Sequence, residues 1–200
     1  MNIVHVCLCN RWGGQEMLVH TVAKAQKQRG HSVCVVARQK SPLANAASQD
    51  GIETKVYKSG LHILSFPFQF KALLAKMSAD VVHFHQLRAV RRLLPLLPQK
   101  GARPAYIFTE HSPRPHSVAS WFNSYSLSLL DTILVVSRSQ KEVVSKQLSV
   151  PLDRLKVLYN GVDSNKYSPL NKAARSAARN ELGIPDTVKL VVCAGRVVKP

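Results

Sequence analysis

Short apolar runs alternate with longer amphipathic segments along most of the chain. The apolar runs are Ile3–Cys9, Val33–Ala37, Ile52–Tyr57, Val81–Phe84, Tyr106–Thr109 and Thr132–Val136. Runs of this length are typical of buried strands, and the segments between them are long enough for helices. The alternation therefore predicts β-α-β units that build an α/β fold with a Rossmann-like, doubly wound parallel sheet.

Four of the segments between these runs carry helix signals. Apolar residues recur at helical spacing in three of them, at Leu18, Val22 and Ala25, at Phe70, Leu73, Leu74 and Met77, and at Val118, Phe122, Tyr125 and Leu129. Gly30 is placed as the C-terminal cap of the first. Ser139 and Glu142 have the spacing of a capping box, which predicts the start of a fourth helix.

The organisation changes near residue 160. A short strand is followed by an Asn160-Gly161 turn and a polar stretch marked by Pro169, as at the end of a domain. Asn171–Leu182 then predicts a polar helix, and Lys189–Cys193 predicts an apolar strand. We therefore expect a Rossmann-like domain over residues 1–165, a linker helix within 166–186, and the start of a second Rossmann-like domain at 187–200.

The chain is strongly basic, with 28 Lys and Arg against 11 Asp and Glu and a formal charge of +17. This balance favours an anionic partner, which can be nucleic acid, an acidic membrane surface or a phosphorylated substrate. No segment approaches the roughly 18 uninterrupted apolar residues of a membrane span, so we expect a soluble or peripheral protein. The four cysteines lie in apolar runs without metal-ligand spacing, which predicts reduced, packed thiols in a cytosolic protein and no zinc site.

After the first apolar run the sequence reads CNRWGGQE, at residues 9 to 16. Two adjacent glycines are costly to order, so Gly13 and Gly14 indicate a need for bare backbone. At the start of a helix they would let a phosphate or a sugar approach unpaired N–H groups. The spacing is neither the dinucleotide fingerprint nor a Walker loop, and packing at a tight turn is the alternative interpretation.

Six segments in order resemble the family 4 retaining glycosyltransferases of the GT-B fold. They are GGQE, DVVHFHQ at 80 to 86, FTEHS at 108 to 112, ILVVSRSQKE at 133 to 142, VLYNGVD at 157 to 163 and CAGRVVKP at 193 to 200. The resemblance implies two Rossmann-like domains facing across a cleft. The first would bind mainly the acceptor and the second mainly the nucleotide-sugar donor, so this chain would be the acceptor domain with the start of the donor domain.

The resemblance also assigns site residues. Gly13 and Gly14 match a glycine loop whose backbone lies near the donor diphosphate and the acceptor. His111 matches a histidine beside the transferred sugar, and Arg196 matches an arginine that pairs with the diphosphate.

Glu16 and His85 are further candidates for acceptor binding. A carboxylate in the first turn of a helix is stabilising in any case, and a structural histidine is the alternative at position 85, as a core position is for His83. Lys199 is off register for the family's donor-site lysine, and a Glu-x7-Glu motif is absent, so we expect this chain alone to lack a working donor site.

By the same resemblance, the reaction would retain the anomeric configuration without a metal ion or a cofactor. Fixed cations and amide N–H groups would stabilise the leaving diphosphate, and His111 would contact the sugar. The implied partners are a nucleotide-sugar and a glycan, lipid-linked or phosphorylated acceptor. Many such enzymes build bacterial lipopolysaccharide or other envelope glycans at the inner face of the cytoplasmic membrane.

Two other classes of protein compete with a transferase. A nucleic-acid-binding protein is not expected, because the basic residues are scattered and no recognition motif is present. A GT-B sugar-nucleotide epimerase, which needs no separate acceptor, stays open.

The segment QLRAVRRLL at 86 to 94 offers a more local use for the charge. A helix there, ended by Pro95, would place Leu87, Val90, Leu93 and Leu94 on one side and Arg88, Arg91 and Arg92 on the other. The basic side is either a solvated face or a surface that docks on an anionic membrane leaflet or a phosphorylated acceptor.

Overall fold

The computed structural model describes residues 1–58, 62–111, 121–164 and 167–193. The chain divides into two compact units, Met1–Asn160 and Gly161–Pro200. The first unit contains the whole sheet and the second contains one described helix.

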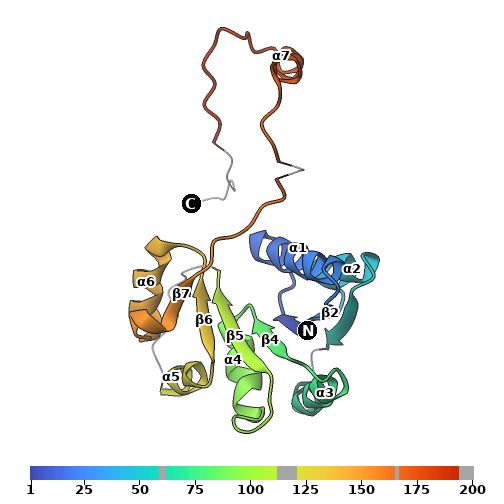
Figure 1. The fold of residues 1–200 in the computed structure, drawn as a ribbon, viewed down its shortest axis with the longest axis vertical. Coiled ribbons are helices and arrows are strands. Elements are labelled where there is room, and N and C mark those ends of the chain that lie inside the picture. The colour runs from blue at the N-terminus through green and yellow to red at the C-terminus, as the bar shows by residue number, and fades with distance from the viewer. Residues whose placement is uncertain (59–61, 112–120, 165–166, 194–200) are drawn as a thin grey trace. The chain divides into compact units, whose positions relative to one another are not determined.

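The first unit is built on a seven-stranded sheet with the order β3-β2-β1-β4-β5-β6-β7, and every pair of neighbours is parallel (Figure 1). The strands are β1 (Asn2–Cys7), β2 (Ser32–Arg38), β3 (Glu53–Tyr57), β4 (Val81–Phe84), β5 (Ala105–Glu110), β6 (Thr132–Val135) and β7 (Leu155–Val157). The predicted Rossmann-like parallel sheet is confirmed.

Helices cover both faces of the sheet, as a parallel sheet requires. They are α1 (Gly14–Gln28), α2 (Pro42–Gln49), α3 (His62–Lys76), α4 (Leu87–Leu93), α5 (Trp121–Ser128) and α6 (Arg138–Leu148), with 3-10 turns η1 (Leu94–Leu96) and η2 (Leu152–Arg154). Helices α1 and α2 lie together on one face, packed on β1 and β2 (Figure 1). The other four contribute to a larger core on the opposite face.

Two predicted helix faces are confirmed. On α3 the side chains of Phe70, Leu73 and Leu74 are buried. On α4 the apolar side is buried and Arg88, Arg91 and Arg92 are exposed. A dense apolar stripe with charges opposite therefore gave the correct orientation in both.

The face predicted for α1 is wrong by one position. Leu18, Val22 and Ala25 are half-buried. The buried residues are Glu16, Val19 and Ala23. The helix is rotated so that small and β-branched side chains pack closely on the sheet, and Glu16 is carried inward to cap the helix start. Gly30, at φ +83°, follows the end of the helix as predicted.

Two further local predictions are corrected by the structure. The helix face assigned to Phe122, Tyr125 and Leu129 is wrong, because Tyr125 is 46% exposed while Asn123, Ser126 and Leu127 are buried. Leu129 lies just beyond the end of α5 and is half-buried against the core, and Val118 lies outside the described residues.

Helix α6 is capped by Ser137 rather than Ser139. The Ser137 hydroxyl accepts a hydrogen bond from the Gln140 N–H at 3.2 Å. The first helical residue follows this cap, so the proposed capping box at Ser139 and Glu142 begins two residues too far into the helix.

The second unit contains α7 (Lys172–Glu181), which Asn171 caps by accepting a hydrogen bond from the Ala174 N–H at 2.9 Å. The predicted polar helix is confirmed. The predicted strand at Lys189–Cys193 is not formed: Val191 is 94% exposed, and no described residue of this unit supplies a neighbouring strand for it. Cys193 is likewise exposed rather than packed.

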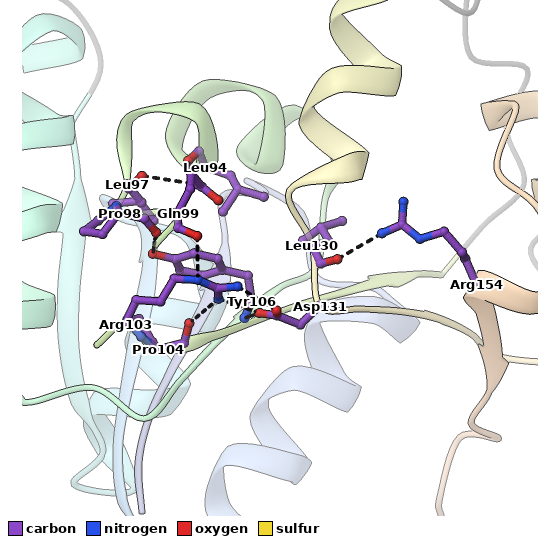
Figure 2. Close-up of polar contacts among 10 residues, drawn as sticks. All are labelled: Leu94, Leu97, Pro98, Gln99, Arg103, Pro104, Tyr106, Leu130, Asp131 and Arg154. Atoms are coloured by element: carbon purple, nitrogen blue, oxygen red, sulfur yellow. Dashed lines mark hydrogen bonds and ion pairs between the residues drawn. The ribbon is translucent and has the colours of Figure 1, made fainter. Parts of the chain in front are cut away.

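The amino ends of β5 and β6 are tied together by a polar network (Figure 2). Both terminal nitrogens of Arg103 donate to the Asp131 carboxylate at 2.7 Å. That carboxylate also accepts from the Tyr106 N–H at 2.7 Å, and the Tyr106 hydroxyl donates to the Pro98 carbonyl at 2.9 Å. The Arg103 guanidinium therefore holds the pKa of Asp131 below its usual value. These contacts hold the amino ends of β5 and β6 together, so we assign them a structural role.

Replacing Asp131 with alanine is expected to destabilise the chain by about 1–3 kcal/mol, because the Tyr106 N–H and Arg103 both lose their acceptor. Urea unfolding of the chain measures the loss. Asp153→Ala, at an exposed carboxylate of η2, is the matched control and should change the unfolding free energy little. Equal effects from the two variants would contradict a structural role for the network.

Candidate functional site

The site lies where the strand order reverses, between β1 and β4. Chains leaving two adjacent parallel strands toward opposite faces open a crevice at the carboxyl ends, which is the usual ligand position in such sheets. The Gln86 side chain joins the two exits: its oxygen accepts from the Leu8 N–H at 2.9 Å, and its nitrogen contacts the Cys9 sulfur. The segments that follow β1 and β4 are thereby held together.

The two glycines form the turn that enters α1. Gly13 is the N-cap residue, and its N–H donates to the Glu16 carboxylate at 2.9 Å. Glu16 is only 4% exposed. This contact gives Glu16 a structural duty at the start of the helix; its predicted part in acceptor binding stays a prediction.

Packing does not account for glycine at position 14. A Cβ atom built on Gly14 would meet no described atom within 4 Å, whereas one on Gly13 would lie 3.3 Å from the Glu16 carboxylate. Gly14 also has no left-handed backbone that would demand glycine. The backbone of the first helical residue is therefore open to approach, as binding of a phosphate or a sugar requires.

Replacing Gly14 with alanine is expected to have opposite effects on folding and binding. Alanine favours a helix over glycine by up to about 1 kcal/mol, so stability should stay equal or rise. A ligand that approaches the bare backbone should bind more weakly, because the methyl group takes its space. Calorimetric titration of the intact protein and thermal unfolding measure the two effects. Gly161→Ala, also at an open position, is the control, and unchanged ligand affinities would favour packing alone.

A row of hydrogen-bonded side chains connects α1, β1 and the ends of β4 and β5. His5 lies on β1, His85 follows β4, and His111 follows β5. The His5 Nε2 atom is 2.7 Å from the Gln26 Oε1 atom, and the His5 Nδ1 atom is 3.0 Å from the His85 Nε2 atom. The His85 Nδ1 atom is in turn 3.0 Å from the His111 Nε2 atom. We call Gln26, His5, His85 and His111 the histidine row.

Burial keeps these rings neutral. Desolvation lowers the pKa of His5, and it lowers the pKa values of His83 and His85 well below the ordinary one. The pKa of His111 falls to about 4, mainly through desolvation, although the Glu16 carboxylate acts to raise it. At neutral pH these histidines are therefore donors and acceptors rather than cations.

The structure brings several of the predicted residues together. His85 and His111 are in direct contact, and the charge of Glu16 reaches His111 from the glycine turn. His83 is half-buried, and its Nε2 atom lies 2.7 Å from the Thr109 hydroxyl. Arg196 and Lys199 lie outside the described residues.

Sequence reasoning missed His5, Gln26 and Gln86. A signal existed for His5, because a polar residue inside a fully apolar strand must find a partner. Gln26 gives no such signal, since it occupies an ordinary position within the first helix and becomes relevant only once α1 lies over β1.

Two groups of side chains have the composition of metal sites. The ligand atoms of His5, His83 and His85 lie within 4.8 Å of one another, as do those of Cys7, Cys9 and Glu16. Both ring nitrogens of His5 and His85 are already engaged in the row, so a metal there would have to break these hydrogen bonds. In the second group, Gln15 donates to the Cys7 sulfur and the Gly13 N–H occupies Glu16. In both groups several of the ligand atoms thus already have a hydrogen-bond partner within the fold.

A comparison with known families decides the identity. The model described as Glycosyltransferase Family 4 matches residues 12–166, which include the glycine turn, His85 and His111. The chain belongs to glycosyltransferase family 4. No curated protein matches this family 4 chain in a sequence comparison.

Solved glycosyltransferases share the fold. HepE of Anabaena, in complex with UDP, aligns with 92% of the family 4 chain at a TM-score of 0.70 and 18% identity. A glycosyltransferase from Rickettsia africae aligns with 94% at a TM-score of 0.73 and 19% identity. The lipopolysaccharide outer core galactosyltransferase WaaB aligns with 82% at a TM-score of 0.62 and 15% identity. The chain spans 50%, 50% and 46% of these proteins, respectively.

Proposed function

We propose that this family 4 chain is the acceptor-binding part of a retaining glycosyltransferase, which moves a sugar from a nucleotide-sugar to a glycan or lipid-linked acceptor. A second, donor-binding domain completes the enzyme, as the doubled length of the similar structures suggests. UDP-sugars are the donors we favour, because HepE has been solved with UDP and with UDP-glucose. The likeness to WaaB supports a role in lipopolysaccharide or other envelope glycan synthesis.

The observation that carries the proposal is the open backbone at Gly14. It lies at the amino end of a helix and at the reversal of strand order, and the Glu16 carboxylate of the same helix start acts electrostatically on the neutral His111 ring. Helix N–H groups suit the oxygens of a diphosphate, and an uncharged imidazole suits a sugar hydroxyl. We infer that amide groups and fixed cations stabilise the departing diphosphate and that transfer needs neither a metal ion nor a cofactor.

The test is transfer by the intact protein, with its second domain, from a panel of UDP-sugars to glycan and lipid-linked acceptors. We expect a glycoside whose anomeric configuration, determined by NMR, is that of the donor, and activity that survives a metal chelator. Conversion of the donor to its epimer without transfer would replace the proposal by an epimerase. Failure to bind any nucleotide-sugar would refute both.

The basic face of α4 supports an anionic acceptor or an anionic membrane surface, and we propose that this surface is the cytoplasmic side of the inner membrane. Arg88, Arg91 and Arg92 line a hollow of about 380 Å³ together with Phe122. The Arg91 guanidinium lies 5.9 Å from the centre of the Phe122 ring. Among the described residues no helix is long and apolar enough to cross a bilayer, so we propose peripheral attachment through this face.

Replacing the three arginines with glutamine is expected to weaken binding to anionic vesicles by about two orders of magnitude, at roughly 1 kcal/mol for each charge. Co-sedimentation with phosphatidylglycerol vesicles measures the change, and moderate salt should release the unmodified protein. Lys71, Lys76 and Lys100, which are also exposed, provide a control triple with the same change in net charge. If vesicle binding weakens equally in both triple variants, the attraction depends on the net charge and not on the basic face of α4.

A further inference from the structure

The histidine row has a direction, because the residue at its inner end can only accept. The Gln26 Oε1 atom is an amide oxygen, and it lies 2.7 Å from the His5 Nε2 atom. An amide oxygen has no proton to give. The His5 Nε2 atom must therefore carry the hydrogen of this contact.

The donor at one ring nitrogen determines the donor in the next hydrogen bond of the row. A neutral imidazole carries one N–H, so the Nδ1 atom of His5 is an acceptor once its Nε2 atom is the donor. The Nε2 atom of His85, 3.0 Å away, must then donate to it. His5 and His85 are both buried, and desolvation disfavours a second proton on either ring.

The same step fixes His111. The Nδ1 atom of His85 is left as an acceptor, and the His111 Nε2 atom donates to it at 3.0 Å. We propose that Gln26, His5 and His85 are positioning residues that hold His111 as the Nε2–H tautomer, so that its Nδ1 atom offers a bare electron pair to the ligand. Among the described residues no side chain hydrogen bond occupies that atom.

A bare ring nitrogen selects the chemistry of its partner. It accepts a hydrogen bond from a hydroxyl and repels a phosphate oxygen, which has no proton to donate. On the proposed function, a hydroxyl of the sugar therefore lies at His111, and the diphosphate lies at the N–H groups of α1. The residue that sets this preference is Gln26, near the carboxyl end of α1.

Nitrogen-15 NMR of the histidine rings tests the proposal without any enzymatic turnover. In the wild-type intact protein we expect His111 with a protonated Nε2 atom and a bare Nδ1 atom. Gln26→Glu keeps an acceptor at this position and should leave this tautomer unchanged. Gln26→Lys puts a donor there, which reverses every hydrogen bond of the row and should move the proton of His111 to its Nδ1 atom. Gln28→Lys, an exposed position on the same helix, is the matched control.

A break in the row tests whether Gln26→Lys changes the His111 tautomer through the hydrogen-bonded rings or only through the charge of the new lysine. With His5→Phe, or His5→Asn if the first variant does not fold, the tautomer of His111 should no longer respond to Gln26→Lys. A wild-type His111 with a protonated Nδ1 atom would overturn the proposal, as would a tautomer that ignores Gln26→Lys.

Transfer kinetics then separate this proposal from the proposed function. Gln26→Lys should lower kcat by about tenfold or more, with KM for the donor little changed, because the loss of one well-aligned hydrogen bond to the ligand is worth about that factor. If the His111 tautomer inverts in this variant and transfer is still normal, the row does set the tautomer. In that case His111 takes no part in the reaction.

Discussion

Replacing His111 with alanine in the intact protein is expected to lower turnover by about two orders of magnitude or more. Loss of a single fixed donor or acceptor at a reacting group commonly has an effect of this size. The fold should suffer much less, because His111 is half-buried and its main loss is the hydrogen bond to His85, worth about 1–3 kcal/mol. Initial rates of transfer and urea unfolding measure the two quantities.

His31 provides the matched control. It precedes β2 at the other end of the sheet, where its contact is with the amino terminus of the chain at 3.4 Å. His31→Ala removes an equal side chain and should leave turnover near that of the wild type. A His111→Ala variant that transfers sugar normally, or that is inactive only because it is unfolded, would show that the resemblance misassigns this residue.

Acidification from about pH 6.5 to 4 is expected to destabilise the chain strongly. The folded pKa of His111 is about 4 against an ordinary value of 6.5, so the unfolded chain binds the extra proton throughout this window and stability falls as the pH falls. At about 1.4 kcal/mol for each pKa unit, His111 alone accounts for a loss of about 3 kcal/mol by pH 4. His5, His83 and His85, whose pKa values are also lowered, add to the slope.

Urea unfolding of the chain at intervals between pH 7.5 and 4 would reveal this slope. His83→Asn removes one half-buried titrating ring outside the histidine row, and its curve should fall less steeply with acid. The carboxylates of Asp50 and Asp131 titrate in a lower window, because their pKa values are lowered from 3.8. A stability that is flat down to pH 4 would contradict neutral burial of the rings.

The sheet was predictable because each strand carries its own signal. Val81–Phe84 is apolar except for His83, and it begins and ends where predicted. The errors fall on helices whose orientation depends on neighbours. Tyr125 has the right spacing for a buried face, yet Ser126 and Leu127 are turned inward in its place. Spacing gives the period of a helix, while the packed surface decides which side is turned toward it.

The site was predictable only in part, and for a related reason. His85 and His111 each follow a strand, so their meeting at one edge of the sheet could be anticipated. Their link to Gln26 could not, because it depends on α1 lying across β1 and on His5 facing that helix. For Gly14 the sequence left two interpretations open, packing at a tight turn and approach of a ligand. Only the structure reveals that the space beside Gly14 is empty.

The pairing of β1 with β4 also has a consequence for how the protein folds. Every other pair of neighbouring strands in the sheet is consecutive in sequence, whereas Ile3 must find Val81 across two intervening strands. Closing that long loop is entropically the most demanding contact, so we expect β1-β2-β3 and β4-β5-β6-β7 to form early and to join late. His5 lies on one half, and His85 and His111 on the other. A partly folded chain would then have both of its halves and still lack the row that defines its site.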